Sequence, residues 1–406
     1  MRILALTARF PLPPLKGDKL RAWHILRHLA RRHQIDLISF LPPAEQSHLK
    51  QAETVFGRID TVPSHRRDAF RRLALSPFSP RPFQAEALTS LRMQSLIESR
   101  LSSATYDVIF VSLLRMMPNL PQSPPCPVVG DFVDSMVLNF SNRLEKQKGI
   151  LRPLVAEELR RLRVYEPQVA GRCDRVTVVS AADRQAIGTP NVWVLPNGVD
   201  TEQFRPNPII PSKPRIVFTG NLSYFPNVDA ITYFARTVFP LILERCRAAQ
   251  LEIAGVSPSR SVQALECLQN VTVHGFVENL PQFINSASLA ICPTRCGSGM
   301  QNKMLEAMAC GVPVVASSFA ANGIPLASDG VHFLRADTPE DARDAIVRLL
   351  NTPSDRQAIG QAGLELVRES FSWEHAAAVM ETLFAEVVRS GGANHASPEQ
   401  VTAAGR

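Results

Sequence analysis

The chain has 406 residues, of which 45% are hydrophobic and 20% charged, a composition typical of folded proteins and unlike that of disordered or fibrous chains. This length predicts two or three domains, with a core that needs no disulfide or metal. The net charge of +7 divides into +10 for residues 1–205 and −3 for residues 206–406, so we expect the halves to bind different partners. Nucleic acid, an anionic membrane and a phosphorylated substrate are all compatible with this charge.

The first residues and the cysteines indicate the cellular compartment in which we expect the protein to work. The apolar run 3–8 is followed by prolines and lacks a small-residue cleavage site, so we expect a buried strand rather than a secretion signal. Seven cysteines, an odd number, are scattered through the chain, which indicates a reduced, cytoplasmic protein. Cys292 and Cys296 have no second ligand pair nearby, so we predict no metal site.

Apolar runs alternate with helical patterns through the first half. The expected strands are residues 3–8, 35–40, 108–111, 128–129 and 176–179. Between the first two, apolar residues recur at helical spacing, which predicts an amphipathic helix with Arg21 and His24 on its solvated face.

The alternation begins again after a segment with five prolines, residues 196–214, which we interpret as a linker. The expected strands of the second half are residues 216–219, 251–254, 271–273, 289–292 and 314–316.

Strand–helix alternation predicts an α/β fold with two doubly wound, Rossmann-like domains, whose ligands bind beyond the carboxyl ends of the strands and, by default, in a cleft between the domains. We expect an acceptor domain at 1–205, a nucleotide-sugar domain at 206–370, a helix at 371–390 that packs back on the body, and a disordered tail at 391–406.

The most informative segment is residues 288–318. A buried strand ends at Pro293, and a glycine-containing loop, 297–299, leads into a helix that carries Lys303 and Glu306. Free backbone N–H groups at such a helix start favour anions, and Lys303 would add charge, while Glu306 could accept hydrogen bonds from a sugar diol. The alternative is an ordinary Lys303–Glu306 surface pair on a helix that ends at Gly311.

The run from Lys303 through Glu306 to Gly311-Val-Pro313 resembles the donor-binding motif of family-4 retaining glycosyltransferases of the GT-B fold. Further resemblances to this family follow in the expected order: Leu195-Pro-Asn-Gly-Val-Asp200, Phe218-Thr-Gly220, His274-Gly-Phe-Val277 and Phe371-Ser-Trp373. Gly17-Asp18-Lys19-Leu-Arg21 and Phe225-Pro-Asn227-Val-Asp229-Ala230 resemble a bacterial subgroup of exopolysaccharide-type sugar transferases.

The resemblance implies a donor site for a nucleoside diphosphate sugar. Glu306 would bind the ribose, and Lys303 with the 297–299 loop would hold the diphosphate. The remaining implied donor-site residues are Gly220, Phe276, Val277, Gly297, Ser298 and Gly299. Ser298 stands where the family usually has a glutamate, and Asn221 and Asn227 stand in the stretch that often holds an arginine and a lysine. We therefore expect Arg295 to contact the diphosphate, because its planar guanidinium suits phosphate oxygens.

The first domain should bind the acceptor. Its expected acceptor or phosphate loop consists of Gly17, Asp18, Lys19 and Arg21, although Asp18 could instead be a helix N-cap and the cations ordinary surface charges. Asp131 and Asp134 follow a strand and are candidate catalytic bases, and Lys303 would stabilise the leaving group. The resemblance implies retention of configuration and a hexosyltransferase that requires no metal or cofactor.

The leading hypothesis is thus a cytoplasmic glycosyltransferase of cell-surface polysaccharide or glycolipid assembly, acting on a carbohydrate or lipid-linked acceptor. Alternatives are a non-catalytic sugar-nucleotide-binding module and a transferase with a small-molecule acceptor. Arginines flanking Phe70, at 66–72, and a second basic stretch at 161–165 could contact an anionic membrane or be solvated surface. Nucleic acid is not expected as a partner, because no aromatic–basic interleaving is present.

Overall fold

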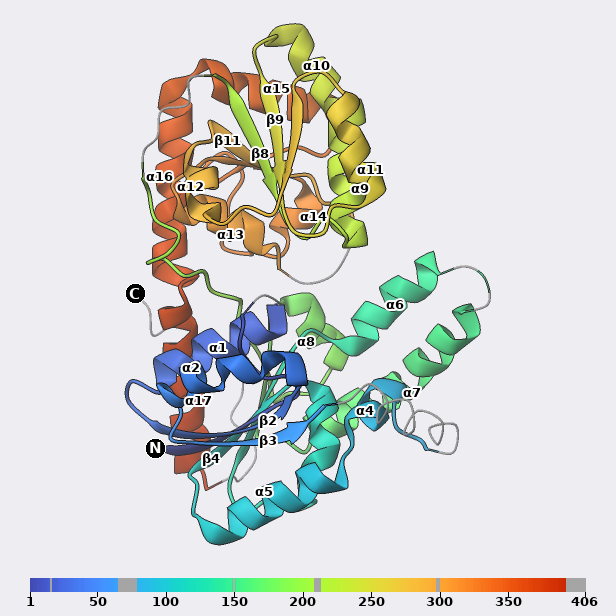
Figure 1. Ribbon diagram of the computed structural model, residues 1–406, viewed down its shortest axis with the longest axis vertical. Helices are drawn as coiled ribbons and strands as arrows, with labels where there is room; N and C mark the ends of the chain where they lie inside the picture. Colours follow the sequence, from blue (N-terminus) through green and yellow to red (C-terminus); the bar gives the residue numbers. More distant parts are fainter. Residues whose placement is uncertain are drawn as a thin grey trace. The chain divides into compact units, whose positions relative to one another are not determined.

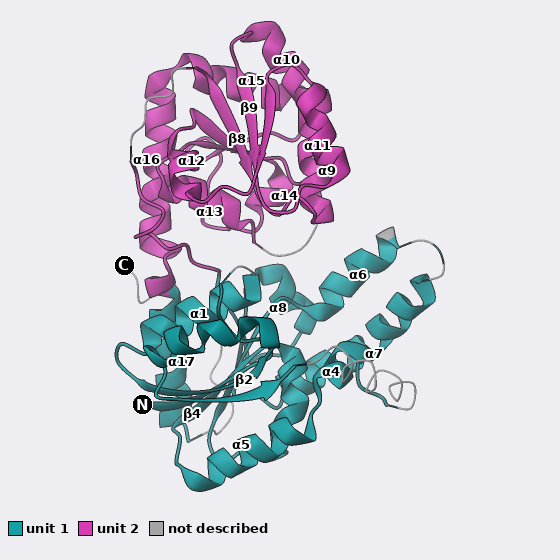
Figure 2. Cartoon of the chain, in the orientation of Figure 1, with its two compact units in different colours: residues 1–196, 376–406 teal, residues 197–375 magenta. Residues whose placement is uncertain are grey.

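The computed structural model describes residues 1–14, 17–64, 79–147, 149, 151–207, 213–296 and 300–391. The chain forms two compact units, which are Met1–Pro196 together with Ala376–Arg406, and Asn197–His375 (Figure 2). The division falls after Pro196, at the start of the proline-rich segment 196–214, whereas the boundary predicted from the sequence lies at 205. The expected tail lies outside the described residues from 392 onward.

The first unit contains a seven-stranded parallel sheet in the order β3-β2-β1-β4-β5-β6-β7. Its strands are β1 (Arg2–Thr7), β2 (Gln34–Leu41), β3 (Arg58–Pro63), β4 (Val108–Ser112), β5 (Val128–Val133), β6 (Arg175–Val178) and β7 (Val192–Val194). The strand order reverses between β1 and β4, which is where open α/β sheets bind their ligands.

Helices cover both faces of this sheet (Figure 1). They are α1 (Gly17–Leu29), α2 (Leu49–Glu53), α4 (Phe83–Leu88), α5 (Leu91–Ser103), α6 (Met136–Lys146), α7 (Arg152–Ala170) and α8 (Ala181–Ile187), with 3-10 turns η1 (Pro43–His48) and η3 (Leu114–Asn119). Leu4 and Leu6 of β1 pack into a core with Met93 and Ile97 of α5. Because alternate residues of β1 point to opposite faces and all but its first are buried, both faces must be covered.

The second unit contains a six-stranded parallel sheet in the order β10-β9-β8-β11-β12-β13. Its strands are β8 (Arg215–Thr219), β9 (Gln250–Ala254), β10 (Val271–Gly275), β11 (Leu289–Cys292), β12 (Val314–Ala316) and β13 (Leu334–Arg335). Here the strand order reverses between β8 and β11, which predicts a ligand site at their carboxyl ends.

Two cores flank the second sheet. One packs against α13 and α16, through Met304, Met308 and Val367, and the other packs against α9 and α15, through Ile231 and Ile346. The helices are α9 (Phe225–Tyr233), α10 (Phe239–Arg245), α11 (Arg260–Gln263), α12 (Leu280–Asn285), α13 (Asn302–Ala309), α14 (Ser318–Ala321), α15 (Pro339–Asn351) and α16 (Pro353–Ser370), with a π-turn η4 (Phe234–Val238) and a 3-10 turn η5 (Ala264–Cys267).

The last helix, α17 (Trp373–Arg389), returns to the first unit. Phe384 meets Phe110 of β4 edge to face, with ring centroids 6.2 Å apart. Glu381 forms an ion pair with Arg32 at 2.6 Å, and its Oε1 lies 2.8 Å from His33 Nε2. The α17 helix therefore supplies part of the cover of the first sheet, on the face that α5 leaves free.

The fold class predicted from the sequence is confirmed, since both sheets are parallel and covered by helices. One local expectation is wrong. Arg21 and His24 were assigned to the solvated face of α1, yet they are only 0% and 5% exposed. Arg21 is buried because it pairs with a carboxylate from a distant strand, Asp131 of β5.

Candidate functional site

The α13 helix begins just past the carboxyl end of β11. Met304, Leu305 and Met308 are buried in the core, and this turns Lys303 and Glu306, three residues apart, toward the other side of the helix. The helix ends at Gly311, whose φ of +70° is the left-handed conformation that closes many helices. The motif from Lys303 to Pro313 thus forms a helix and its termination, with two charged side chains on one half-buried face.

Lys303 is held by a neutral partner. Its Nζ donates a hydrogen bond to Oδ1 of Asn227 over 2.5 Å and lies 4.6 Å from the centre of the Phe218 ring. Burial lowers the pKa of the Lys303 ammonium, and Glu306 only partly opposes this. The ammonium therefore occupies a poorly hydrated position in which an anion would be a favourable further partner.

Glu306 shares this poorly hydrated environment. Burial raises the pKa of its carboxyl to about 7, although Lys303 acts in the opposite direction. A carboxyl group whose pKa is near 7 can accept hydrogen bonds from hydroxyl groups, and when protonated it can donate one as well. These are the bonds that a sugar diol requires.

The loop after β8 reaches the same place. Gly220 has a φ of +153°, and a Cβ at this position would lie 2.9 Å from Nδ2 of Asn227, so a larger residue would displace the amide that holds Lys303. Nδ2 of Asn227 donates to the carbonyl oxygen of Asn221 at 3.0 Å. Gly220, Asn227 and Lys303 thus meet where the strand order reverses between β8 and β11.

The segment after β10 supplies an exposed aromatic ring. Phe276 is 69% exposed, whereas Val277 packs against the core beside α13. His274 Nε2 lies 2.8 Å from Oε2 of Glu252, and the His274 ring meets Phe283 edge to face. These contacts fix the strand end from which Phe276 projects, and an exposed ring on a fixed support suits stacking against a planar ligand.

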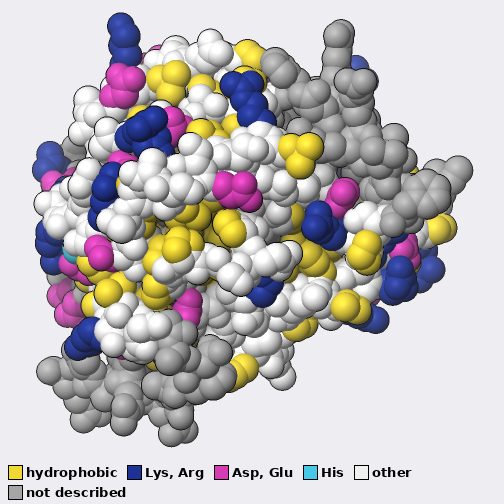
Figure 3. Space-filling view, turned by 90° about the horizontal axis from the view of Figure 1, so that it is seen from below, with side chains coloured by type: hydrophobic (Ala, Val, Ile, Leu, Met, Phe, Trp, Pro, Cys, Tyr) yellow, Lys and Arg dark blue, Asp and Glu magenta, His cyan; other side chains and the backbone are white. Residues whose placement is uncertain are grey.

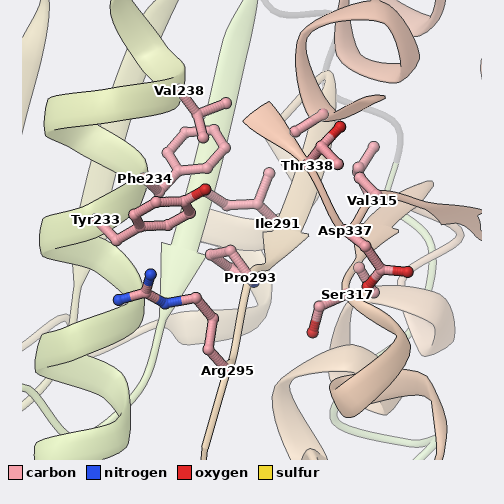
Figure 4. Close-up of a pocket in the computed structure, with 13 residues that line it drawn as sticks. Tyr233, Phe234, Val238, Ile291, Pro293, Arg295, Val315, Ser317, Asp337 and Thr338 are labelled. Carbon is pink, nitrogen blue, oxygen red and sulfur yellow. The ribbon is translucent and has the colours of Figure 1, made fainter. Parts of the chain in front are cut away.

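Arg295 already has a partner. Its guanidinium makes two hydrogen bonds to Asp229 of α9, at 2.9 and 3.2 Å, and stacks 3.9 Å from the centre of the Tyr233 ring. Figure 4 shows Arg295 beside Tyr233 among the residues that line a cavity of about 40 Å³, which is too small for a sugar. A diphosphate would have to compete with Asp229, so the assignment of Arg295 to the donor stays a prediction. Gly297, Ser298 and Gly299 lie outside the described residues.

In the first unit, α1 begins at Gly17. Asp18 accepts two hydrogen bonds from Arg9, both at 3.1 Å, and Lys19 is buried, with an ion pair to Glu45 at 2.9 Å. Together with Arg21, which pairs with Asp131, three of the four residues predicted for the acceptor loop are therefore already bound to charged groups of the first unit.

Arg21 and Asp131 form a buried ion pair. Both are 0% exposed, and Nε of Arg21 donates to both carboxylate oxygens of Asp131, at 2.9 and 3.0 Å. Thr177 donates a further bond to Asp131 at 2.7 Å, and Arg21 also donates to the carbonyl of Pro196. This arrangement gives the pair a role inside the unit, joining α1 to β5, and leaves Asp131 badly placed to take a proton from a ligand.

Asp134 is placed differently. It follows Val133, which has a φ of +69°, a costly conformation for a β-branched residue, and its side chain is partly accessible. Burial raises the pKa of the Asp134 carboxyl to about 6, and the neighbouring Asp183 adds to this. A carboxylate with this pKa is suited to act as a general base near neutral pH.

Two family models match consecutive parts of the chain. The model described as "Glycosyltransferase Family 4" matches residues 19–203, and "Glycosyl transferases group 1" matches residues 213–352, so that together they span most of both units. The chain is a family-4 glycosyltransferase.

The relatives of this glycosyltransferase are distant. A GDP-mannose-dependent alpha-(1-6)-phosphatidylinositol monomannoside mannosyltransferase of Mycobacterium tuberculosis is 29% identical over 239 residues, and the chain spans only 60% of its length. That match covers 50% of the present chain. The phosphatidyl-myo-inositol mannosyltransferase of Mycobacterium leprae is 24% identical, over 77% of this chain and 83% of the relative.

Solved structures show the same GT-B fold. Sucrose-phosphate synthase from Thermosynechococcus elongatus matches with a TM-score of 0.70 at 16% identity, covering 96% of this chain and all of that one. Anabaena HepE in complex with UDP-glucose matches with a TM-score of 0.63, also at 16% identity, over 96% of this chain and 100% of its own.

Sequence reasoning missed several residues of this glycosyltransferase. Asn227 was noted only as a departure from the family pattern, although it is the partner of Lys303. Glu166 also escaped notice, yet it is 0% exposed and accepts bonds from Ser135 Oγ and Met136 N, at 2.7 and 2.6 Å, where α6 begins beside Asp134. The signal that could have found Glu166 is a glutamate at a buried position of an amphipathic helix, a feature that Glu158 of the same helix shares.

Two further findings concern metals and membranes. Among the described residues, no group of three His, Cys, Asp or Glu side chains could hold a metal ion, and a reaction without metal stays a prediction. No helix in the described part of the chain is both long and apolar enough to cross a bilayer. All seven cysteines are free.

Proposed function

We propose that the protein transfers a hexosyl group from a nucleoside diphosphate sugar to a carbohydrate or lipid-linked acceptor, with retention of configuration and without a metal. The observation that carries the proposal is the desolvated Lys303 ammonium beside Glu306, held by a neutral amide at the point of strand reversal in the second unit. Membership of family 4 supports the same reaction class.

Lys303 has the properties that the leaving group needs. When the glycosidic bond to the donor breaks, negative charge grows on the diphosphate oxygens. A fixed cation in a poorly hydrated site stabilises this charge more strongly than one in water, because it needs no reorganisation as the charge develops. Since Asn227 carries no charge, it orients the ammonium without neutralising it. The backbone N–H groups at the start of α13 would add to the stabilisation.

Glu306 and Phe276 would bind the nucleoside. The carboxyl of Glu306 would accept hydrogen bonds from the ribose hydroxyls, one turn of α13 beyond Lys303. The exposed Phe276 ring, with Val277 behind it, would pack against the base. Neither group selects a particular base, so a donor panel is needed to identify it.

The first unit would bind the acceptor and supply the catalytic base. Of the two predicted carboxylates, we assign the base to Asp134, because Asp131 is fully buried against Arg21. Retention, which the family resemblance implies, would follow from attack on the face that the leaving group departs. The anomeric configuration of the product, read by NMR, tests this part of the proposal.

A lipid-linked or cell-surface glycan acceptor is favoured over a small molecule by two relatives whose names include phosphatidylinositol acceptors. We place the reaction in the cytoplasm, where free cysteines persist and nucleotide sugars are donors, with peripheral contact to the inner face of the membrane. Assembly of exopolysaccharide is the role suggested by the subgroup resemblance.

The membrane contact would use α7. Leu154 and Val164 of α7, and Leu151 just before it, are exposed, as are Arg152 and Arg163, and this is the mixture that favours an anionic bilayer surface. On the face drawn in Figure 3, basic side chains are scattered rather than gathered into one patch. The basic segment 66–72 lies outside the described residues. Sedimentation with vesicles, with and without anionic lipid, tests the contact; binding independent of anionic lipid contradicts it.

The donor reaction is tested with a panel of uridine, guanosine and adenosine diphosphate sugars. We expect one donor to release its diphosphate in the presence of the enzyme, and Glu306→Ala to abolish the release. Ser298, in place of the usual glutamate, keeps a second candidate function in view, a non-catalytic sugar-nucleotide-binding module. Thermal stabilisation by a nucleotide without release of diphosphate from any donor would favour the module and contradict the enzyme.

A further inference from the structure

A second cavity lies within the first unit, where its strand order reverses. It has a volume of about 290 Å³. Arg9 follows β1 on this rim, Arg115 follows β4 on η3, and Lys19 lies on α1. The carboxyl ends of β1 and β4 flank the reversal point, the place where α/β sheets bind ligands. The cavity thus has both the position and the size of a binding site.

Two of its three cations are already paired. Nζ of Lys19 forms an ion pair with Glu45 at 2.9 Å and donates to the carbonyl of Leu12 at 3.0 Å. The Arg9 guanidinium donates two bonds to Asp18, both at 3.1 Å. These pairs hold the cavity wall in place and contribute no net charge.

Arg115 is different. Among the described residues, its guanidinium makes one side-chain hydrogen bond, a long one of 3.4 Å from Nη1 to the neutral amide oxygen of Gln84. No carboxylate of the described residues lies within ion-pair distance of its guanidinium. Burial lowers the pKa of Arg115 and the charge of Arg9 lowers it further, whereas Asp18, which is itself paired with Arg9, acts in the opposite direction. A half-buried cation without an ion-pair partner is costly, and a bound anion would reduce this cost.

We propose that this cavity binds a singly charged oxyanion of the acceptor, either the carboxylate of an acidic sugar or a phosphate diester, on the guanidinium of Arg115. Three cations against Glu45 and Asp18 leave one positive charge, which such a group balances. The planar guanidinium presents parallel N–H donors that match carboxylate or phosphate oxygens. The inference rests on the proposed function, since it makes the first unit the site of the acceptor.

The test measures anion binding without any donor. Glucuronate, dimethyl phosphate and neutral glucose are titrated separately into the full chain and followed by ligand-observed NMR. We expect at least one of the two anions to bind and glucose to bind much more weakly. Arg115→Gln should weaken anion binding about tenfold or more, since a charge-assisted pair is lost. Arg115→Lys, which keeps the charge but not the fork, should lie between the two.

Matched controls separate this site from other effects. Arg92→Gln removes the same charge from an exposed position on α5 and should leave anion binding unchanged. Lys303→Gln, in the donor site, should also leave it unchanged. Arg115→Gln should not lower Tm, because it removes an uncompensated charge, so lost binding cannot be ascribed to unfolding.

Whichever anion binds identifies the acidic group of the acceptor. The proposal is overturned if neither anion binds the wild-type protein, or if Arg115→Gln and Arg92→Gln have the same effect. Because donor turnover is measured separately, a protein that binds anions through Arg115 but releases no diphosphate would contradict only the proposed transfer. Turnover without anion binding would contradict only the acceptor site.

Discussion

The ammonium of Lys303 lies 2.5 Å from the amide oxygen of Asn227, so the cation at the start of α13 is oriented by a neutral group rather than a carboxylate. The two residues are 76 positions apart and come from the helices that follow β11 and β8. This contact joins the starts of α9 and α13 at the reversal point of the sheet. It also leaves the full charge of Lys303 available to a diphosphate.

The first prediction concerns this amide. Asn227→Asp would place a carboxylate on Lys303 and compete with phosphate oxygens, so we expect the affinity for the nucleoside diphosphate to fall about tenfold, as for the loss of a charge-assisted bond. Calorimetric titration measures the change. Asn322→Asp, an exposed site on the same unit, is the control for added charge. Equal affinity of Asn227→Asp and wild type would show that Lys303 does not meet the diphosphate.

The pH dependence of donor binding provides a second prediction. Burial lowers the pKa of Lys303, so its charge is lost at a lower pH than that of an exposed lysine. Nucleoside diphosphate affinity should therefore fall as pH rises through this lowered pKa. Lys303→Arg keeps its charge at alkaline pH, so its affinity, even if weaker overall, should not show this decline. Parallel profiles for the two proteins would contradict the assignment.

A third prediction concerns stability and Glu306. Its folded pKa of about 7 lies above the ordinary value of 4.5, so the native state binds the proton more tightly than the unfolded state. The stability contribution is therefore present at pH 4 and is lost as pH rises toward 7 and beyond. Glu306→Gln should unfold at a higher temperature than wild type at pH 8, by about 2–4 °C for each kcal/mol regained. At pH 4 the two proteins should have the same Tm. A lower Tm for Glu306→Gln than for wild type at pH 8 would contradict the prediction.

The fourth prediction is that Asp131→Asn mainly lowers stability, whereas Asp134→Asn mainly lowers activity. Asp131→Asn leaves the buried Arg21 charge uncompensated and should cost about 3–5 kcal/mol of unfolding free energy, measured with denaturant. Asp134→Asn should change the free energy of unfolding little, because burial destabilises the charged form of this carboxyl at neutral pH and the neutral amide avoids that penalty. The same substitution should abolish transfer. In the wild type, transfer should decline as pH falls below about 6. Full activity of Asp134→Asn would remove it as the base.

The sequence predicts the central strands well and the edges poorly. Strands such as β1 and β11 are buried on both faces and therefore appear as continuous apolar runs. Three edge strands lack such runs and are not predicted: β3 is only partly buried, and β7 and β13 have three and two residues. The remaining edge strand, β10, is predicted from the run 271–273.

The candidate site divides in the same way. Lys303 and Glu306 stand out because one helix carries both, three residues apart. Contacts between distant parts of the chain leave no local pattern. Arg21 was assigned to a solvated face because its partner, Asp131, lies 110 residues away. Arg115 lies in a 3-10 turn with no motif, so only the folded sheet brings it beside Arg9.

Titration of uridine and guanosine diphosphate into wild type and Lys303→Gln tests the central claim most directly. We predict one binding site for at least one nucleotide, with affinity at least about tenfold weaker in Lys303→Gln, since a charge-assisted contact is lost. Arg92→Gln, with the same charge change on the first unit, should bind as wild type does. Equal binding by Lys303→Gln and wild type would contradict the account of the donor site.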